Sequence, residues 1–515
     1  MIGRPLLTRA ESTAADRSLI DAGVPGIVLM ENAGRAATDL AMLRFPGALG
    51  RVVVVGGVGQ NGGDAWVLAR HLLTRGVRAD VFLVGDPARV AGDAASALAG
   101  LRAVGMTPTV IASTGEAAAI ESLRGATTLV VDGLFGTGLD RPLEGLAHDV
   151  VRGLDAWSVP RVALDVPSGV CADTGRVLGA ALRADLTVTF HAAKRGLHHA
   201  PGLDLAGEVF VADIGVPPPQ TARARLVGEE ELAACARRRA NDSHKGTAGH
   251  ALIIAGSPGK TGAALLAGLG AIRAGAGLVT LAARGAARAA LDAKVVELMT
   301  REVPEALEAG VAAVLSDAAR ASSAVLGPGL GLDAGTRSFV RRLAVELPVP
   351  TVIDADGLRA LDESSLASLA KAAAPRVLTP HPAEAGALLG LGTAEVQADR
   401  FACAERLAEL TKQIVVLKGA RTVVAARGEL RICDRGTPAL GVAGTGDVLS
   451  GVISALLGAA RAEDEGAAFA SAWQGVVAHA LAGERAAAGR DRGLLAGEVA
   501  EAVSFVLAAS LTRRR

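Results

Sequence analysis

Short runs of Val, Ile and Leu alternate with Ala-rich stretches of helical length along most of this chain. A run that is apolar on both faces has to be buried on both faces, as happens to strands of a parallel sheet covered by helices. The alternation therefore predicts an α/β fold class with parallel sheets. The runs that we expect to be strands are Val52–Val55, Val81–Val84, Leu129–Val131, Val162–Leu164, Leu186–Phe190, Val209–Val211, Ala251–Ala255, Leu278–Leu281, Val352–Asp354, Val377–Thr379 and Ile414–Leu417.

One segment interrupts this alternation and predicts a domain boundary. Gly215–Gln220 reads GVPPPQ, and its three prolines cannot donate the backbone hydrogen bonds that a strand or helix interior needs. An Arg-rich stretch up to Arg239 follows, which we expect to be helical, and the alternation then restarts. With 515 residues, the chain has room for two or three domains. We place the boundary near residues 216–240 and predict domains at residues 1–220 and 225–515.

The composition excludes several classes of protein. The chain has 53 Lys+Arg, 53 Asp+Glu and only 2% aromatic residues, whereas a general nucleic-acid binder needs a basic excess and stacking platforms. The longest apolar stretch, Ala263–Ala283, contains Arg273 and several glycines, which predicts a buried helix and strand and no membrane span. The 4 cysteines are far apart and form no CxxC pair. We therefore expect a reducing compartment, the cytoplasm, and neither a nucleic-acid nor a membrane partner.

Polar residues follow three of the expected strands in the first half. A Gly-rich turn, VVVVGGVGQNGGD at Val52–Asp64, opens a helix, and the backbone amides of such a turn can approach a phosphate. Because the carboxyl ends of parallel strands meet at one edge, the polar side chains after these strands should lie together. Oxygen ligands of this kind suit potassium, sodium or magnesium, and helix capping is the alternative. The residues concerned are Asn61, Asp132, Asp165 and Ser168.

This half resembles the NAD(P)H-hydrate epimerase family over about residues 5–215. The motifs that carry the resemblance are LMENAG at Leu29–Gly34, GQNGGD at Gly59–Asp64, DGLFGTGLDRP at Asp132–Pro142 and DVPSG at Asp165–Gly169. Two positions depart from the family pattern: Gln60 stands where an Asn is usual, and Ala65 where a Gly is usual. The resemblance implies a Rossmann-like parallel-sheet domain that binds hydrated NADH and NADPH.

The resemblance also implies roles for individual residues. Potassium would be held by Asn61, Asp132 and Ser168. The substrate has a hydroxyl on carbon 6, next to the ring nitrogen whose lone pair helps that hydroxyl leave, so epimerisation needs an acid/base group and a shielded cation. We choose Asp165 for that group, as the remaining carboxylate that faces the pocket. The residues implied to hold the hydrated dinucleotide are Gln60, Asn61, Gly62, Gly63, Asp64, Gly136, Thr137, Gly138, Leu139, Asp140, Arg141, Pro142 and Asp165.

In the second half, a Gly-Thr-Gly turn opens a helix directly at Asp447, within VAGTGDVLSG at Val442–Gly451. Turn amides and a helix N-terminus form an anion hole, and a carboxylate beside it can take the proton of a hydroxyl during phosphoryl transfer. A capped helix is the alternative. His381 and Lys418 each follow an expected strand, which favours ligand contacts over a structural His and a solvated Lys. No GxxxxGK[ST] motif occurs, so the turn is not a Walker loop.

This half is similar to the ADP-dependent NAD(P)H-hydrate dehydratase family, which has a ribokinase-like fold, over about residues 235–510. The motifs are HKGTAG, GPGLG, DADGL, TPHPAE and AGTGDVLSG, and Lys260 stands where Met is common. The similarity implies that ADP arrives with magnesium. It implies that Ala263, Gly331 and His381 contact the hydrated dinucleotide and that Asp447 contacts it as the base. The adenine nucleotide would be contacted by Lys418, Gly419, Ala420, Arg421, Thr422 and Gly446.

Together the two resemblances predict a bifunctional repair enzyme. It would interconvert the R and S forms of hydrated NAD(P)H and dehydrate the S form with ADP, releasing AMP and phosphate. We also expect a homo-oligomer. One alternative is a ribokinase-like kinase of a small metabolite with a nucleotide-binding regulatory domain, and another is a dinucleotide-binding scaffold with degenerate sites. Retention of Asn61, Asp165 and Asp447 argues against the scaffold.

Overall fold

The computed structural model describes residues 2–217 and 222–513. The chain divides into two compact units, an N-terminal unit of Pro5–Ala224 and a C-terminal unit of Arg225–Arg515 that also includes Met1–Arg4. Pro218–Gln220, the part of the Pro-rich segment with two of its three prolines, lies outside the described residues. Among the described residues, no helix combines the length and the apolar character needed to cross a membrane.

A seven-stranded sheet forms the centre of the N-terminal unit, in the order β4-β3-β2-β5-β6-β7-β9. All neighbouring strands pair in parallel, for example Val54 with Val81 on one side and with Val131 on the other. This topology confirms the predicted parallel α/β class. The strands of this sheet are β2 Val52–Gly56, β3 Ala79–Val84, β4 Thr109–Ile111, β5 Leu129–Gly133, β6 Arg161–Leu164, β7 Leu186–Phe190 and β9 Glu208–Ala212. The short strands β1 Arg4–Leu7 and β8 Ala193–Lys194 pair with each other in parallel outside this sheet.

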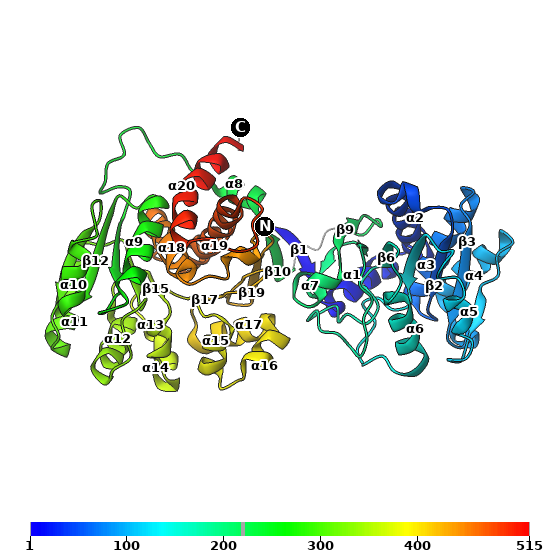
Figure 1. Cartoon of the computed structure of the whole chain (residues 1–515), viewed down its shortest axis with the longest axis horizontal. Helices are drawn as coiled ribbons and strands as arrows, with labels where there is room; N and C mark the ends of the chain where they lie inside the picture. Colours follow the sequence, from blue (N-terminus) through cyan, green and yellow to red (C-terminus); the bar gives the residue numbers. More distant parts are fainter. Residues whose placement is uncertain (1, 218–221, 514–515) are drawn as a thin grey trace. The chain divides into compact units, whose positions relative to one another are not determined.

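Helices cover both faces of this sheet. On one face α2, α3 and α4 pack against each other over a core that includes Trp66, and on the other face α6 packs over a core that includes Trp157 (Figure 1). Burial on both faces explains why the central strands are almost purely aliphatic. The helices are α1 Arg9–Asp21, α2 Gly26–Arg44, α3 Gln60–Thr74, α4 Gly92–Ala103, α5 Ala118–Glu121, α6 Gly145–Asp155 and α7 Gly202–Leu205.

The sheet of the C-terminal unit has the order β13-β12-β11-β14-β15-β16-β17-β18-β19-β10. The strands from β13 to β17 pair in parallel, and β18 and β19 continue the sheet in antiparallel pairing. Antiparallel neighbours at one side of a parallel sheet are common in large α/β sheets. The strands are β10 Ala224–Val227, β11 His250–Ile254, β12 Leu278–Arg284, β13 Met299–Val303, β14 Ser323–Leu326, β15 Thr351–Ile353, β16 Arg376–Leu378, β17 Ile414–Leu417, β18 Val423–Ala426 and β19 Glu429–Cys433.

In this unit α9, α18, α19 and α20 share one core with the sheet, while α11 to α14 lie on the opposite face (Figure 1). Small residues allow close approach: a Cβ atom on Gly451 of α18 would lie 1.9 Å from the Ala267 carbonyl oxygen of α9. The helices are α8 Glu229–Cys235, α9 Thr261–Arg273, α10 Gly285–Asp292, α11 Leu307–Ala318, α12 Ala334–Glu346, α13 Asp356–Arg359, α14 Glu363–Ser368, α15 Pro382–Leu389, α16 Thr393–Ala398, α17 Arg400–Thr411, α18 Thr445–Ala460, α19 Glu465–Ala487 and α20 Ala496–Arg513.

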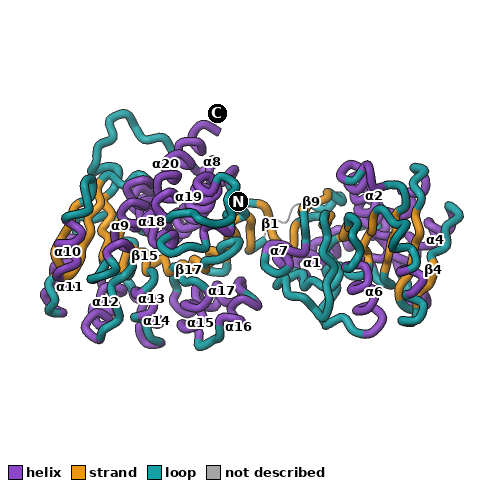
Figure 2. The backbone as a smooth tube through the Cα atoms, viewed as in Figure 1, coloured by secondary structure: helices purple, strands orange, loops and turns teal. Residues whose placement is uncertain are grey.

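One local prediction was wrong, and one predicted strand is confirmed but less buried than expected. The Arg-rich stretch is helical only as far as Cys235, and residues 236–249 form a loop (Figure 2). The three successive arginines at 237–239 lack the apolar stripe that a helix needs for tertiary packing. The run Val209–Val211 is a strand, but β9 forms the edge of its sheet, so the Phe210 side chain is exposed.

Candidate active sites

A cavity of about 980 Å³ lies at the carboxyl edge of the N-terminal sheet, where β2, β3, β5 and β6 end. Helix α1 and the loop after β5 form its other walls. The turn that opens α3 brings Asn61 and Asp64 into the wall, and Asp165 enters it from the end of β6. Asp16 and Lys194, which the sequence analysis did not select, line the same cavity. The Lys194 ammonium therefore shares this space with the carboxyl groups of Asp16, Asp64 and Asp165.

The three residues predicted to bind a cation reach the loop after β5. The Ser168 hydroxyl donates to Asp132 Oδ1 at 2.6 Å, and the Ser168 backbone N–H donates to Oδ2 at 2.8 Å. Burial raises the pKa of Asp132, although hydrogen bonds from Ser168 and Leu134 counter part of that rise. A Cβ atom on Gly136 would lie 3.2 Å from Asn61 Oδ1, so Asn61 reaches the same loop from α3.

Asn61 is the observation that favours a cation here. Its side chain is buried, and neither Oδ1 nor Nδ2 has a hydrogen-bond partner among the described residues. A buried amide oxygen without a partner is costly, and such groups are normally satisfied by a water molecule or an ion. Asp132 and Ser168 add buried oxygens to the same loop, and oxygen donors are what potassium prefers. The residues present therefore fit a cation. The described residues contain no group of three His, Cys, Asp or Glu arranged to hold a metal.

Asp165 has an unfavourable backbone conformation, and contacts with Lys194 and Thr137 hold its side chain in place. Its backbone lies in the left-handed region at φ 62°, which costs a residue with a side chain about 1 kcal/mol. Lys194 Nζ lies 2.6 Å from Asp165 Oδ1, and the Thr137 amide donates to Oδ2 at 3.1 Å. Burial opposes ionisation of Asp165, but the Lys194 ammonium and the Thr137 amide outweigh it, so its pKa is lowered. Asp165 is therefore a carboxylate at neutral pH.

Lys194 is almost completely buried, at 1% exposure, on the short strand β8. Besides Asp165, its ammonium donates to Thr189 Oγ1 at 3.0 Å and to the Phe190 carbonyl at 2.8 Å. Three partners satisfy the three N–H donors of a lysine. Lys194 thus fixes Asp165 in place and sets its charge.

Asp64 differs from Asp165 although both line the same cavity. Burial raises the pKa of Asp64 well above its usual range, and the negative charges of Asp165 and Asp16 add to the rise. Burial also raises the pKa of Asp16. Neighbouring carboxyl groups whose pKa values move apart are typical of acid/base sites. The cavity wall therefore holds one carboxyl group with a lowered pKa, Asp165, beside two with raised pKa values, Asp64 and Asp16.

Several residues predicted to bind the substrate lie away from the cavity wall. Gly62 and Gly63 serve close packing: a Cβ atom would lie 1.9 Å from the Gly57 carbonyl oxygen in one case and 2.5 Å from Met30 in the other. Asp140 is exposed and pairs with Arg9 at 3.0 Å. Gln60, Gly136, Thr137, Gly138 and Arg141 do line the cavity, whereas Leu139 and Pro142 do not.

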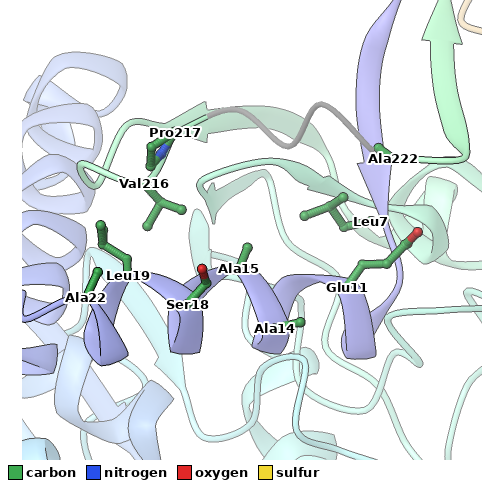
Figure 3. A pocket seen from close by; sticks show the side chains of 10 residues that line it. All are labelled: Leu7, Glu11, Ala14, Ala15, Ser18, Leu19, Ala22, Val216, Pro217 and Ala222. Carbon is green, nitrogen blue, oxygen red and sulfur yellow. The ribbon is translucent and has the colours of Figure 1, made fainter.

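A second cavity of about 460 Å³ runs along the other side of α1 (Figure 3). Its wall is mostly Ala, Leu, Val and Pro side chains, with Ser18 and Glu11 as the polar exceptions among the described residues that line it. The Glu11 carboxylate already accepts from the Thr8 amide and hydroxyl in a capping box. This cavity gathers no reactive groups, so we place the candidate site of this unit in the first cavity.

The candidate site of the C-terminal unit lies where α18 begins. Gly444 precedes the helix with φ at 92°, a left-handed conformation that suits glycine, and Asp447 lies in the first helical turn. Burial raises the pKa of Asp447 to about 7, and the negative charge of Asp354 adds to the rise while Lys418 opposes it. A carboxyl group that titrates near neutrality beside the amides of a helix N-terminus suits a general base.

Lys418 lies next to this turn and close to two carboxylates. Its Nζ atom is 2.8 Å from Asp354 Oδ1 and 3.9 Å from Glu384 Oε2. Burial opposes the charge of Lys418, but these two carboxylates outweigh burial and raise its pKa. Ser450 donates to the second oxygen of Asp354 at 2.7 Å. A Cβ atom on Gly446 would lie 3.5 Å from Lys418 Nζ, so the turn packs against this ion pair.

A strained residue separates Asp354 from Asp356 in the DADGL motif. Ala355 has φ 51° and ψ −120°, a conformation that residues with a side chain rarely adopt. Asp356 accepts from the Gly331 amide at 3.0 Å and from Lys260 Nζ at 3.2 Å. Ala263 lies beside them, 3.3 Å from where a Cβ of Gly329 would be. Predicted residues of α9 and of the loop after β14 thus come together at Asp356.

His381 caps α15 with its own side chain. Its Nδ1 atom accepts from the Ala383 and Glu384 amides at 3.2 and 3.3 Å, while the half-exposed ring lies 3.4 Å from the Glu384 carboxylate. The substrate contact of His381 stays a prediction, because this structure gives it a capping role without excluding a second contact.

Several site residues were not predicted from the sequence, because their roles depend on long-range contacts. Lys194 lies only a few residues after the end of β7, but nothing nearby in the sequence marks it as the partner of Asp165. Asp354 is the first residue of the DADGL motif, and its position directly after a strand could have indicated a site residue. Ser450 lies one helical turn after Gly446 on α18, so helical periodicity would have placed the two on one face.

Two α/β units that each carry ionisable side chains at the carboxyl edge of a parallel sheet define a two-domain enzyme of the nucleotide-binding class. A family model described as YjeF-related protein N-terminus matches residues 26–196, and one described as NAD(P)H-hydrate dehydratase matches residues 251–504. A bifunctional NAD(P)H-hydrate repair enzyme of Moorella thermoacetica is 37% identical, with 98% of this chain and 96% of the relative covered. One from Thermanaerovibrio acidaminovorans is 38% identical, with 96% of each covered.

A solved structure of an ADP/ATP-dependent NAD(P)H-hydrate dehydratase from Bacillus subtilis, co-crystallised with ATP and Mg²⁺, is similar to the C-terminal part. It is 29% identical with a TM-score of 0.46, and the match covers 55% of this chain and 97% of that one. The chain belongs to the family of bifunctional NAD(P)H-hydrate repair enzymes. The predicted family is thereby confirmed, and the kinase alternative is not favoured.

Proposed function

We propose that this chain repairs hydrated NADH and NADPH in two reactions, an epimerisation in the N-terminal unit and an ADP-dependent dehydration in the C-terminal unit. One observation carries the proposal. Each unit, within its own family match, keeps a carboxyl group with a shifted pKa at the edge of its sheet: Asp165 in the first and Asp447 in the second.

In the epimerisation, the bond between carbon 6 and its hydroxyl breaks as the ring nitrogen lone pair forms a C=N bond. The hydroxyl takes up a proton and leaves as water, and a water molecule then adds to the other face and gives up a proton. Asp165 is the acid/base group, and its ionised state suits it to accept the proton of the adding water. Burial and the negative charge of Asp165 raise the pKa of Asp64, so the approach of a second negative charge to Asp165 is disfavoured.

Asn61, Asp132 and Ser168 would hold potassium next to this centre, as the unpartnered amide of Asn61 supports. When bound, the cation would supply a fixed positive charge and order the loop after β5. The hydrated dinucleotide would contact Gln60, Asn61, Asp64, Gly136, Thr137, Gly138, Arg141 and Asp165, which line the cavity. Gly62, Gly63, Leu139, Asp140 and Pro142 would act through the shape of the turn and of the loop.

In the dehydration, the carbon 6 hydroxyl attacks the terminal phosphoryl group of ADP, and AMP leaves. Asp447 takes the hydroxyl proton, and the amides at the start of α18 stabilise the transferring group. The ring nitrogen then expels phosphate, and loss of a proton from carbon 5 restores the dihydropyridine. Ala263, Gly331 and His381 would contact the dinucleotide, and Lys418 to Thr422 with Gly446 the ADP, which would arrive with magnesium.

The direct test mixes the protein with hydrated NADH, ADP and magnesium and follows the absorbance of NADH. We expect the absorbance to return, and all of a racemic mixture to be consumed. A flat trace from folded protein that still binds a nucleotide would favour the kinase alternative instead. The homo-oligomeric state and the cytoplasmic location stay predictions, to be checked by light scattering and by cell fractionation.

A further inference from the structure

We propose that Arg400 is a positioning residue that supplies the positive charge behind the loop of residues 418–422 and thereby sets the affinity of this loop for the diphosphate of ADP. The proposal rests on the proposed function, since that function assigns the loop to ADP.

The Arg400 guanidinium lies directly behind this loop. Arg400 is the first residue of α17 and is 3% exposed. Its Nη2 donates to the Leu417 carbonyl at 2.9 Å, and its Nη1 donates to the Ala420 carbonyl. A Cβ atom on Gly419 would lie 2.9 Å from Nη2, so the loop backbone rests on the guanidinium and leaves no room for a side chain there. One cation therefore fixes both ends of a four-residue stretch.

These contacts determine which way the peptide groups of the loop point. The C=O and N–H of one peptide unit point in opposite directions, because the unit is planar and trans. With the Ala420 carbonyl turned toward Arg400, the Arg421 amide is turned to the other side. Arg421 also has φ at 56°, so its backbone turns sharply at this point. The Lys418 amide already donates to the Pro380 carbonyl at 2.9 Å, so the Arg421 amide is the group that these contacts turn toward an anion.

The charge of Arg400 has no counter-charge among the described residues. No carboxylate of the described chain lies within 4.0 Å of its guanidinium, and its Nε has no hydrogen-bond partner there. Burial lowers the pKa of Arg400 to about 10, and the side chain remains charged at neutral pH. Lys418 differs, because Asp354 and Glu384 neutralise its ammonium. A buried cation that donates to neutral carbonyl groups is favoured by the approach of an anion. The ADP diphosphate is such an anion, and Lys418 is less free to meet it.

Arg376 provides a matched comparison within the same unit. It is equally buried, and burial lowers its pKa to about 10 as well. However, its guanidinium donates to the Ala344, Val345 and Leu347 carbonyls, at the end of α12. The carbonyl end of a helix carries partial negative charge, which compensates a cation. The carbonyl groups at the end of α12 therefore compensate the charge of Arg376. The two carbonyl groups to which Arg400 donates do not belong to a helix end.

The experiment measures the dissociation constant of ADP by calorimetry at two salt concentrations, with the full chain and three variants. Arg400→Met should bind ADP about tenfold more weakly, equivalent to about 1.4 kcal/mol, and its affinity should depend less on salt. Arg400→Lys, which keeps the charge, should stay within about threefold of the parent. The KM for hydrated NADH and the rate at saturating ADP should change little in both. Arg376→Met should leave ADP affinity unchanged, even if it lowers the melting temperature.

Each outcome decides a separate point. If the parent chain binds no ADP, the proposed function of the C-terminal unit fails and the role of Arg400 fails with it. If the parent binds ADP and Arg400→Met binds it as tightly, only the role of Arg400 is overturned. Equal losses for Arg400→Met and Arg400→Lys would also overturn it, because the shape of the guanidinium and not its charge would then matter. Melting curves show that each variant is folded at the temperature of the titration, and Arg376→Lys replaces Arg376→Met if that control does not fold.

Discussion

Replacing Asp447 by Asn should abolish dehydration and at the same time stabilise the C-terminal unit at alkaline pH. Both effects follow from the buried position of this carboxyl group. Asn cannot accept the proton of the hydroxyl, and loss of a general base typically slows a reaction about 100- to 10,000-fold. Epimerisation should be unaffected, since the acid/base group proposed for it, Asp165, belongs to the other unit.

The stability effect can be worked from the pKa. The pKa of Asp447 rises from 3.8 to about 7, mainly because burial disfavours the charged form. The folded state therefore binds this proton more tightly than the unfolded state. The favourable contribution is fully present below pH 3.8 and is lost as the pH rises through about 7. A shift of about 3 units corresponds to an upper limit of about 4 kcal/mol, and we expect about 2–4 kcal/mol for the variant at pH about 8.

Chemical denaturation of the parent and of Asp447→Asn at about pH 8 and about pH 4 measures this difference. The variant should be more stable at the higher pH, with most of the gain gone at the lower pH. Asp464→Asn is the matched control, because Asp464 is an exposed cap that accepts from the Ala467 amide. Its stability should change by less than about 0.5 kcal/mol, since Asn is also a good cap. Near-normal dehydration by Asp447→Asn without a gain at high pH would show that Asp447 is only a helix cap.

Three further predictions test other parts of the molecule. Lys194→Met should make epimerisation depend on pH, because burial then raises the pKa of Asp165 and the rate should fall as the pH is lowered; a rate profile identical to that of the parent would exclude the positioning role of Lys194. Ala355→Gly should raise the free energy of unfolding by about 1 kcal/mol in denaturation experiments, because glycine tolerates a φ of 51°, and a loss of stability would mean that the strain is absent. Fragments 1–220 and 225–515 should each keep one activity, so that the second alone stalls with about half of a racemic mixture left; complete consumption by that fragment, faster than spontaneous epimerisation, would disprove the division of labour.

The strand pattern could be predicted from sequence because the central strands are buried on both faces. Runs such as Val52–Val55 and Ile414–Leu417 have one simple explanation, and the structure confirms it. Strand β13, MTREV, was missed because it is an edge strand that carries Arg301 and Glu302 in succession and buries only Val303. The residues at which a strand begins and ends depend on the strands that pair with it, and this pairing is a property of the whole fold.

The candidate sites were predictable only where chemistry is local. The glycines of the turn before Asp447 and the polar residues after β2, β5 and β6 could be read from adjacent positions in the chain. The pairs Asp165–Lys194 and Asp354–Lys418 could not, because each joins residues that are far apart in sequence and close only in the folded sheet. These pairs also determine charge states, so the sequence could name the candidate acid/base groups without telling which of them is ionised.

Asp165 and Asp447 differ in pKa, so the two reactions should differ in how their rates depend on pH. Asp165 forms an ion pair with Lys194, which lowers its pKa, so it stays ionised well below neutral pH. Burial raises the pKa of Asp447 to about 7, and the nearby Lys418, which pairs with Asp354, only partly opposes this rise. Epimerisation should then be nearly independent of pH in the neutral range, while dehydration should accelerate as the pH rises through about 7. In mildly acidic conditions dehydration would become the slower reaction. Both epimers would then accumulate at their equilibrium ratio, and removal of hydrated NAD(P)H would be controlled by the protonation of a single carboxyl group.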